Sequence, residues 1–153
     1  MDHGLPLKKL LFQKCVEHID QRIQLIEQTL SSVQESRNNE TKSSVGDKYE
    51  TGRAMMQIEE EKNRAQLVQA LAVKNELMQI DISDQTTHVL PGSLVITNKG
   101  KYFIAIGIGK IEIENVLFYC VSRFSPIGTQ LIGKISGEEI EFNGKHIRID
   151  EVL

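Results

Sequence analysis

The most constraining feature of the sequence is a heptad repeat of apolar side chains that begins at Phe12. Successive members lie alternately four and three residues apart over three repeats. This period matches one face of an α-helix that packs along another helix, as in a coiled coil. The residues between the members are mostly polar and form a solvated face. The members of the repeat are Phe12, Val16, Ile19, Ile23, Ile26, Leu30 and Val33.

A second helix is predicted after a polar turn over residues 35–46, from about Asp47 to Gln79. Each helix has roughly 30 residues and is about 45 Å long. Equal lengths and a short connection predict an antiparallel helical hairpin that projects as an arm, or a bundle with a partner chain as the alternative. The stripe expected to face the first helix is weaker, and Glu61 and Asn75 interrupt it. Its members are Ala54, Ile58, Ala65, Val68, Leu71, Ala72 and Met78.

The second half of the chain has the composition of a β-rich domain. Residues beyond 84 hold six of the eight aromatic residues and eight of the eleven glycines, which favours strands. Asn143-Gly144 between two alternating segments predicts a tight hairpin, and residues 126–132 predict a short helix. Strands are expected over residues 93–97, 102–109, 111–114, 116–121, 139–142 and 145–149.

Together these patterns predict an α+β protein of two domains. A long antiparallel α-helical coiled-coil hairpin occupies residues 1–80, and a polar linker occupies residues 81–85. A small antiparallel β domain with one short helix then covers residues 86–153.

Charge and hydropathy exclude several classes of protein. The net charge of −3 disfavours a protein that grips duplex DNA through its phosphates. No apolar run approaches 18 residues, so no transmembrane helix is expected. The N-terminus lacks the order of a signal peptide. We therefore expect a cytoplasmic protein without a membrane partner, and Cys15 and Cys120 as reduced, buried thiols rather than a disulfide.

Common metal-binding and phosphate-binding motifs are missing from the sequence. The cysteines and the four histidines lack the spacing of zinc ligands. Gly107-Ile108-Gly109 lacks a third glycine and a following helix, so it predicts a bend in a strand rather than a phosphate-binding loop.

The turn between the two predicted helices carries the densest group of charged residues. Asp47 can cap the second helix, with Glu50 three residues later as in a capping box. The alternative is that both carboxylates lie on one face and contribute oxygen ligands to a Mg²⁺ ion held mainly by another molecule. Lys42, Lys48 and Arg53 could then meet phosphate groups.

Two motifs resemble the Gre transcript-cleavage factors of bacterial RNA polymerase. The tip of that family reads roughly Gly-Asp-Leu-Ser-Glu-Asn-Ala, and Gly46, Asp47 and Glu50 are in register with its glycine and its two acids. The second domain of the family has a Ser-Pro-Leu/Ile-Gly/Ala stretch that continues to Leu-Leu/Ile-Gly-Lys. Residues 125–134 read Ser-Pro-Ile-Gly-Thr-Gln-Leu-Ile-Gly-Lys. The resemblance in architecture covers nearly the whole chain.

The resemblance implies a transcription elongation factor that is not itself an enzyme. The second domain would have an FKBP-like fold and dock on RNA polymerase through Phe124, Ser125, Pro126 and Ile127. The arm would enter the secondary channel of the polymerase and bring its tip to the active centre. Asp47 and Glu50 would help hold a second Mg²⁺, shared with the polymerase and not bound stably by the factor alone.

The implied reaction is hydrolysis of backtracked RNA by two-metal chemistry at the nascent 3′ end. Lys42, Lys48 and Arg53 would contact the RNA. The factor is expected to act as a monomer.

This sequence departs from the motifs of the Gre family at several positions, so it resembles a divergent member of that family. The tip has Lys48-Tyr49 and Thr51-Gly52 where the family has Leu-Ser and Asn-Ala, and Phe124 replaces a residue that is often acidic. A secondary-channel regulator or inhibitor without cleavage activity is therefore the main alternative.

Three other functions fit less of the sequence. A prolyl isomerase needs a dense aromatic pocket, whereas this domain has six aromatic residues, most of them needed for a small core. A plain coiled-coil interaction module would not need the tip acids. Regulators of nucleoside diphosphate kinase share the plan of the fold but have a much shorter arm.

Overall fold

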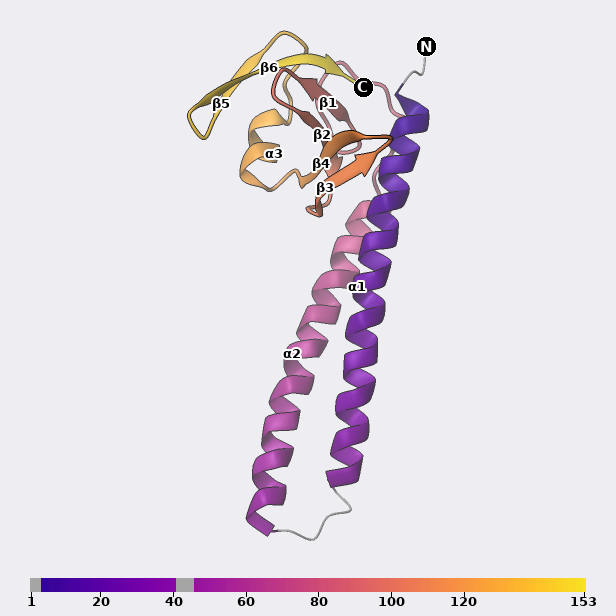
Figure 1. Ribbon diagram of the computed structural model, residues 1–153, viewed down its shortest axis with the longest axis vertical. Helices are drawn as coiled ribbons and strands as arrows, with labels where there is room; N and C mark the ends of the chain where they lie inside the picture. The colour runs from indigo at the N-terminus through magenta and orange to yellow at the C-terminus, as the bar shows by residue number, and fades with distance from the viewer. Residues whose placement is uncertain (1–3, 41–45) are drawn as a thin grey trace. The chain divides into compact units, whose positions relative to one another are not determined.

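The computed structural model describes residues 4–40 and 46–153, with side chains described at these positions except 37, 39, 40 and 46–50. It confirms the α+β fold: two long helices precede a six-stranded sheet that carries one short helix (Figure 1). Contacts divide the chain into two compact units, Met1–His18 with Glu76–Leu153 and, separately, Ile19–Asn75. The first turns of the first helix thus pack with the β-rich part. The domain boundary predicted at residues 81–85 and the FKBP-like character of the sheet stay predictions.

The unit Ile19–Asn75 consists of parts of two helices, α1 (Leu5–Glu40) and α2 (Gly46–Met78). Ile19, Ile23 and Ile26 of the predicted repeat are buried, and Leu30 and Val33 are half-buried. In a unit of two helices only the other helix can bury these side chains, so this part of the repeat is confirmed as the seam. An ion pair of 2.6 Å between Lys74 Nζ and Asp20 Oδ1 also joins the helices.

The stripe predicted for α2 is wrong. All seven of its residues are exposed, and α2 meets α1 through a different face that includes Glu60, Asn63 and Ala70, all buried. The polar members of this face can be buried at little cost because their polar atoms have partners. Glu60 pairs with Arg64, and Asn63 Nδ2 donates to the carbonyl oxygen of Glu59 at 3.0 Å. A hydrophobicity pattern alone counts such residues as surface residues.

The first turns of α1 also differ from the predicted pattern. Leu11 and Cys15 are fully buried, whereas Phe12 and Val16, predicted for the seam, are half-buried. The reason is a change of partner along the helix. These turns belong to the unit of the β-rich part, so they direct a different face inward from the turns that pack on α2.

The sheet has the strand order β3-β4-β2-β1-β6-β5. Four of its five neighbouring pairs are antiparallel, as predicted, and β2 and β4 are parallel. After β2 the chain passes through the bend at Gly107–Gly109 to the edge of the sheet, forms β3, and returns as β4 beside β2. The strands are β1 (Leu94–Thr97), β2 (Lys101–Ala105), β3 (Gly109–Ile113), β4 (Val116–Ser122), β5 (Glu139–Phe142) and β6 (Lys145–Val152).

The predicted hairpin and the predicted short helix are both present. Asn143 and Gly144 join β5 to β6 with φ of 52° and 74°, as this two-residue turn requires. Helix α3 (Pro126–Leu131) packs on one face of the sheet. The core on that face consists of Val89, Val95, Ile104, Ile127, Leu131, Ile140, Ile147 and Ile149.

The other face of the sheet meets the first turns of α1. Phe103 and Cys120 are paired in register across β2 and β4, and both are buried. Since side chains alternate along a strand, they point away from Ile104 and hence from α3. Cys15 of α1 lies next to Cys120 and influences its pKa.

Candidate functional site

The predicted tip acids lie at the N-terminal end of α2, Asp47 in the first turn and Glu50 just after it. The helix begins at Gly46, so Asp47 is inside the first turn rather than before it. A separation of three residues places Asp47 and Glu50 on the same helical face. The positive end of the helix dipole favours ionised carboxylates at this position.

The contacts of the tip residues stay predictions. The side chains of Asp47, Lys48 and Glu50 are outside the described part of the structure, and Lys42 is outside the described residues. Arg53 is described and exposed. Among the described residues, no group of three or more His, Cys, Asp or Glu side chains could hold a metal ion.

The Ser-Pro motif at the start of α3 has a structural role that its side chains explain. Ser125 is the N-cap: its hydroxyl accepts from the backbone N–H of Gly128 at 3.1 Å and donates to the carbonyl oxygen of Ser122 at 2.6 Å. Pro126 occupies the first turn of the helix, where no backbone N–H is needed. Ile127 is buried in the core on this face of the sheet.

Gly128 is required by a close approach of α3 to the end of β4. A Cβ at this position would lie 2.0 Å from the carbonyl oxygen of Ser122. Any other residue would therefore push the helix away from the strand. The motif thus fixes how α3 is held against the end of β4.

Of the four predicted docking residues, Phe124 and Pro126 present their side chains to solvent. Phe124 is 66% exposed, an unusual position for an aromatic side chain. The Arg123 guanidinium lies over its ring, 4.6 Å from the centroid. Ser125 and Ile127 are used internally, the first as a cap and the second in the core.

A groove of about 290 Å³ is lined in part by Arg123; we call it the Arg123 groove. Arg123 Nε is 3.8 Å from Glu76 Oε1, so Arg123 links the groove to the Phe124 ring. The hydroxyl and the backbone N–H of Ser83 donate to Asp81 and hold the pKa of this carboxyl below its usual value. The groove is lined by Glu76, Gln79, Ile80, Asp81, Asp84, Leu90, Pro91, Ala105 and Arg123.

No local pattern in the sequence predicts this groove. Glu76 at the end of α2, Leu90 before β1 and Arg123 after β4 come together only through the tertiary fold. Phe124 could be singled out from the motif, but the cation beside it could not.

The two cysteines are free and buried, and they meet in the same unit. The neighbouring side chain of Cys15 and burial together raise the pKa of the Cys120 thiol. Cys120 therefore stays protonated at neutral pH and is a poor nucleophile. This pair is a packing contact between α1 and β4.

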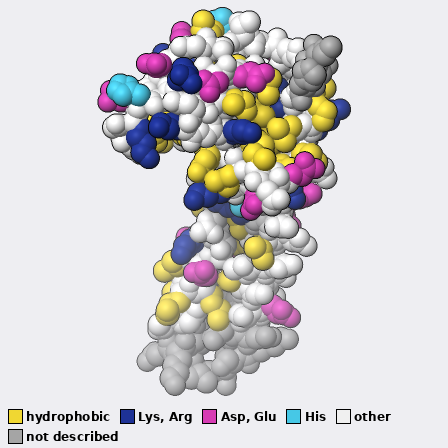
Figure 2. Space-filling view, turned by 45° about the horizontal axis from the view of Figure 1, so that its top comes forward, with side chains coloured by type: hydrophobic (Ala, Val, Ile, Leu, Met, Phe, Trp, Pro, Cys, Tyr) yellow, Lys and Arg dark blue, Asp and Glu magenta, His cyan; other side chains and the backbone are white. Residues whose placement is uncertain are grey.

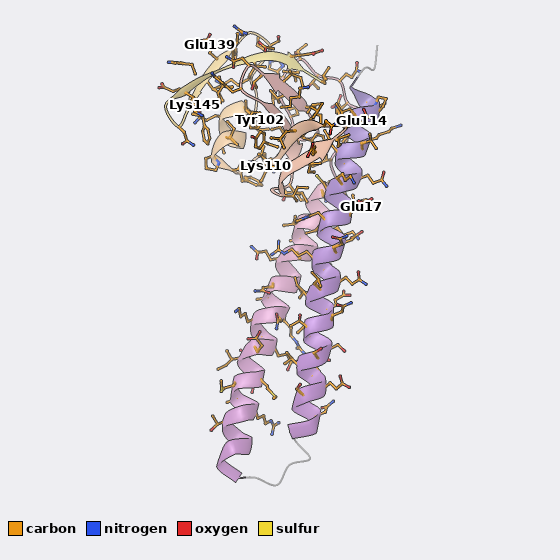
Figure 3. The ribbon with its side chains drawn as sticks, in the orientation of Figure 1. Glu17, Tyr102, Lys110, Glu114, Glu139 and Lys145 are labelled. Atoms are coloured by element: carbon orange, nitrogen blue, oxygen red, sulfur yellow. The ribbon has the colours of Figure 1, made fainter. Side chains whose placement is uncertain are left out.

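The charged side chains labelled in Figure 3 come from several different elements. Lys110 is on β3 and Glu114 is in the turn that follows, while Glu139 and Lys145 belong to the β5–β6 hairpin (Figure 3).

No helix within the described residues is both long and apolar enough to cross a membrane.

Comparison with known proteins gives one structural neighbour. The fold is similar to that in a structure described as the transcription factor Gfh1, with a TM-score of 0.38 and 14% sequence identity. The similarity covers 90% of this chain and 92% of that one. No family model matches the sequence, and no curated protein matches it. The similarity between the two chains is therefore a distant similarity of fold.

Proposed function

We propose that this protein is an accessory factor of RNA polymerase that stimulates Mg²⁺-dependent cleavage of backtracked RNA. The observation that carries the proposal is the position of Asp47 and Glu50 among the first five residues of a 33-residue helix. Such a helix is about 50 Å long, enough to carry a short charged segment into a deep channel. The match of residues 125–134 to the second motif of the Gre family supports the same function.

The chemistry requires only a small contribution from the factor. Mg²⁺ prefers oxygen ligands, is bound through one or two carboxylates, and keeps several waters. Two acids on one helical face can complete the coordination of an ion held mainly by the polymerase and the RNA. In a two-metal site this ion activates a water for attack on the phosphodiester. Arg53, Lys48 and Lys42 would contact the RNA, and the factor alone would not be an enzyme.

Docking is assigned to the exposed part of the Ser-Pro motif, namely Phe124 and Pro126. An exposed aromatic ring with a guanidinium on one face is the kind of anchor that dominates many protein interfaces. Because Ser125 and Ile127 hold α3 in place, they would orient this anchor rather than contact the polymerase.

The docking assignment is tested by Phe124→Ala. Truncation of an anchor should weaken binding to the cognate polymerase at least tenfold, as measured by fluorescence anisotropy. The melting temperature should change little because the ring is exposed. Leu117→Ala, on the exposed part of β4, is the matched control and should bind like the parent. Equal binding by both variants would place the docking surface elsewhere.

One specific observation favours a second candidate, a secondary-channel inhibitor without cleavage activity. The residues that flank the acids, Lys48-Tyr49 and Thr51-Gly52, differ from the family tip. Both candidates share the docking surface, so only the tip acids distinguish them.

A further inference from the structure

Helix α2 has a second apolar face that no described part of its own chain covers. We call it the outer stripe and define it as Ala54, Met55, Ile58, Ala65, Val68, Leu71 and Ala72, all exposed. Met55, Ile58 and Val68 are each about two-thirds exposed, at 66%, 66% and 68%. Hydrophobic side chains on the surface of the two helices are visible in Figure 2. An amphipathic helix at a protein surface needs only one such face, and α2 already buries its other face against α1.

We propose that the outer stripe is a self-association surface, which packs in antiparallel orientation against the outer stripe of a second copy of this chain. The spacing of its residues carries the proposal. Ile58 and Val68 are placed symmetrically about residue 63, and so are Ala54 and Ala72. A two-fold axis at residue 63 therefore sets Ile58 of each copy against Val68 of the other, and Ala54 against Ala72. This is the reciprocal pattern that an isologous dimer requires.

The size of the side chains fits the same arrangement. The larger residues of the stripe are found on both sides of the axis, whereas Ala65 lies close to it. A small residue near the axis lets two helices approach to about 8 Å, the short end of the usual range. The large residues then fill the space on either side.

The charges that interrupt the stripe favour the antiparallel orientation over a parallel one. Glu61 and Lys62 interrupt the stripe next to the axis, both are exposed, and neither forms an ion pair with a described residue of its own chain. The two-fold axis sets Glu61 of each copy level with Ala65 of the other, about 4.5 Å along the axis from Lys62 and about 6 Å from the second Glu61. A parallel pairing in register would set the two Glu61 side chains level with each other, which is more unfavourable.

The expected contact is small. The stripe runs over residues 54–72, about 27 Å of helix. A helix pair of this length buries on the order of 1,000 Å² in total, at the lower end of specific interfaces. We therefore expect reversible association with a Kd of roughly 1–100 μM.

Sedimentation equilibrium of the full chain tests the proposal without any polymerase, so its outcome is independent of the proposed cleavage function. The apparent mass should rise with concentration from 17.3 kDa toward twice that value. Ile58→Glu and Val68→Lys should each weaken association at least tenfold. Neither should unfold the helices, because both side chains are exposed; far-ultraviolet circular dichroism checks this. Leu25→Glu, at an equally exposed position on α1, is the control and should associate like the parent.

Mixing the two variants tests the register. In a mixed dimer Glu at position 58 of one copy faces Lys at position 68 of the other, and the second Ile58–Val68 contact remains intact. An equimolar mixture should therefore recover association that neither variant shows alone. The proposal is overturned if the parent stays monomeric to about 500 μM, if the stripe variants associate as it does, or if the mixture shows no recovery. Capture of this face by another protein would then be the alternative.

Discussion

At the scale of single residues, Gly128 decides how α3 is held against the end of β4. A methyl group there would lie 2.0 Å from the Ser122 carbonyl oxygen, a backbone atom that cannot move without shifting the strand. Gly128→Ala should therefore destabilise the β-rich unit by about 3 kcal/mol or more. The midpoint of urea denaturation, followed by tyrosine fluorescence, measures the change.

Gly107→Ala is the matched control for this prediction. Gly107 lies in the bend after β2, where an added Cβ meets nothing within 4 Å and no positive φ is needed. This substitution should change the unfolding free energy by less than about 0.5 kcal/mol. Similar midpoints for the two variants would mean that the close approach of α3 to Ser122 is not a constraint.

Features of single residues could be predicted from the sequence where a short motif alone determines the local structure. Asn143-Gly144 and Pro126 act within a few residues of their own position, and the hairpin and the helix are where they were expected. The contact between Cys15 and Cys120 joins residues 105 positions apart and has no local signature. For the same reason, the motif alone could not separate the exposed Phe124 from the buried Ile127.

At the scale of elements, the two helices show why one seam was predicted and the other was not. On α1 the inward residues are apolar, so hydrophobic periodicity finds them at Ile19, Ile23 and Ile26. On α2 the inward face contains Glu60 and Asn63, and the more apolar stripe points outward. Periodicity finds the most apolar face of a helix, which need not be the face that its own chain covers.

The sheet was predicted to be antiparallel, so the parallel pairing of β2 with β4 was not predicted. This pairing depends on the path of the chain between the two strands, which no local pattern in the sequence encodes.

The seam of α1 is tested by a pair of neighbouring substitutions. Ile23 is 9% exposed and Leu25 is 64% exposed on the same helix. Ile23→Asp buries a carboxylate that has no partner, so it should destabilise the helical unit by roughly 3–5 kcal/mol. Leu25→Asp should cost less than about 1 kcal/mol. Thermal melts followed at 222 nm compare the two variants.

The distribution of tyrosines adds a check on this experiment. Tyr102 and Tyr119 stack in the β-rich unit, with ring centroids 5.4 Å apart. Their near-ultraviolet signal should survive in Ile23→Asp if the helical unit unfolds separately. Loss of this signal together with the helix signal would show that the two units melt as one.

At the scale of the whole molecule, the proposed function gives a different task to each of the two units. The unit that contains the sheet carries the exposed Phe124 with Arg123, a surface suited to binding. The unit Ile19–Asn75 carries Asp47 and Glu50, which in the proposed function would complete the coordination of a metal ion held elsewhere. A variant of one surface should therefore change one property and leave the other intact.

The rate of Mg²⁺-dependent RNA cleavage in a backtracked polymerase complex with end-labelled RNA tests the proposed function of the tip acids. Asp47→Asn and Glu50→Gln preserve side-chain size and remove the negative charge. If the acids complete a metal site, each variant should cleave about 100-fold or more slowly while binding to the polymerase is unchanged. Glu27→Gln, an exposed acid on α1, should cleave like the parent. Parental rates in both tip variants would contradict the cleavage function and leave the inhibitor as the remaining candidate.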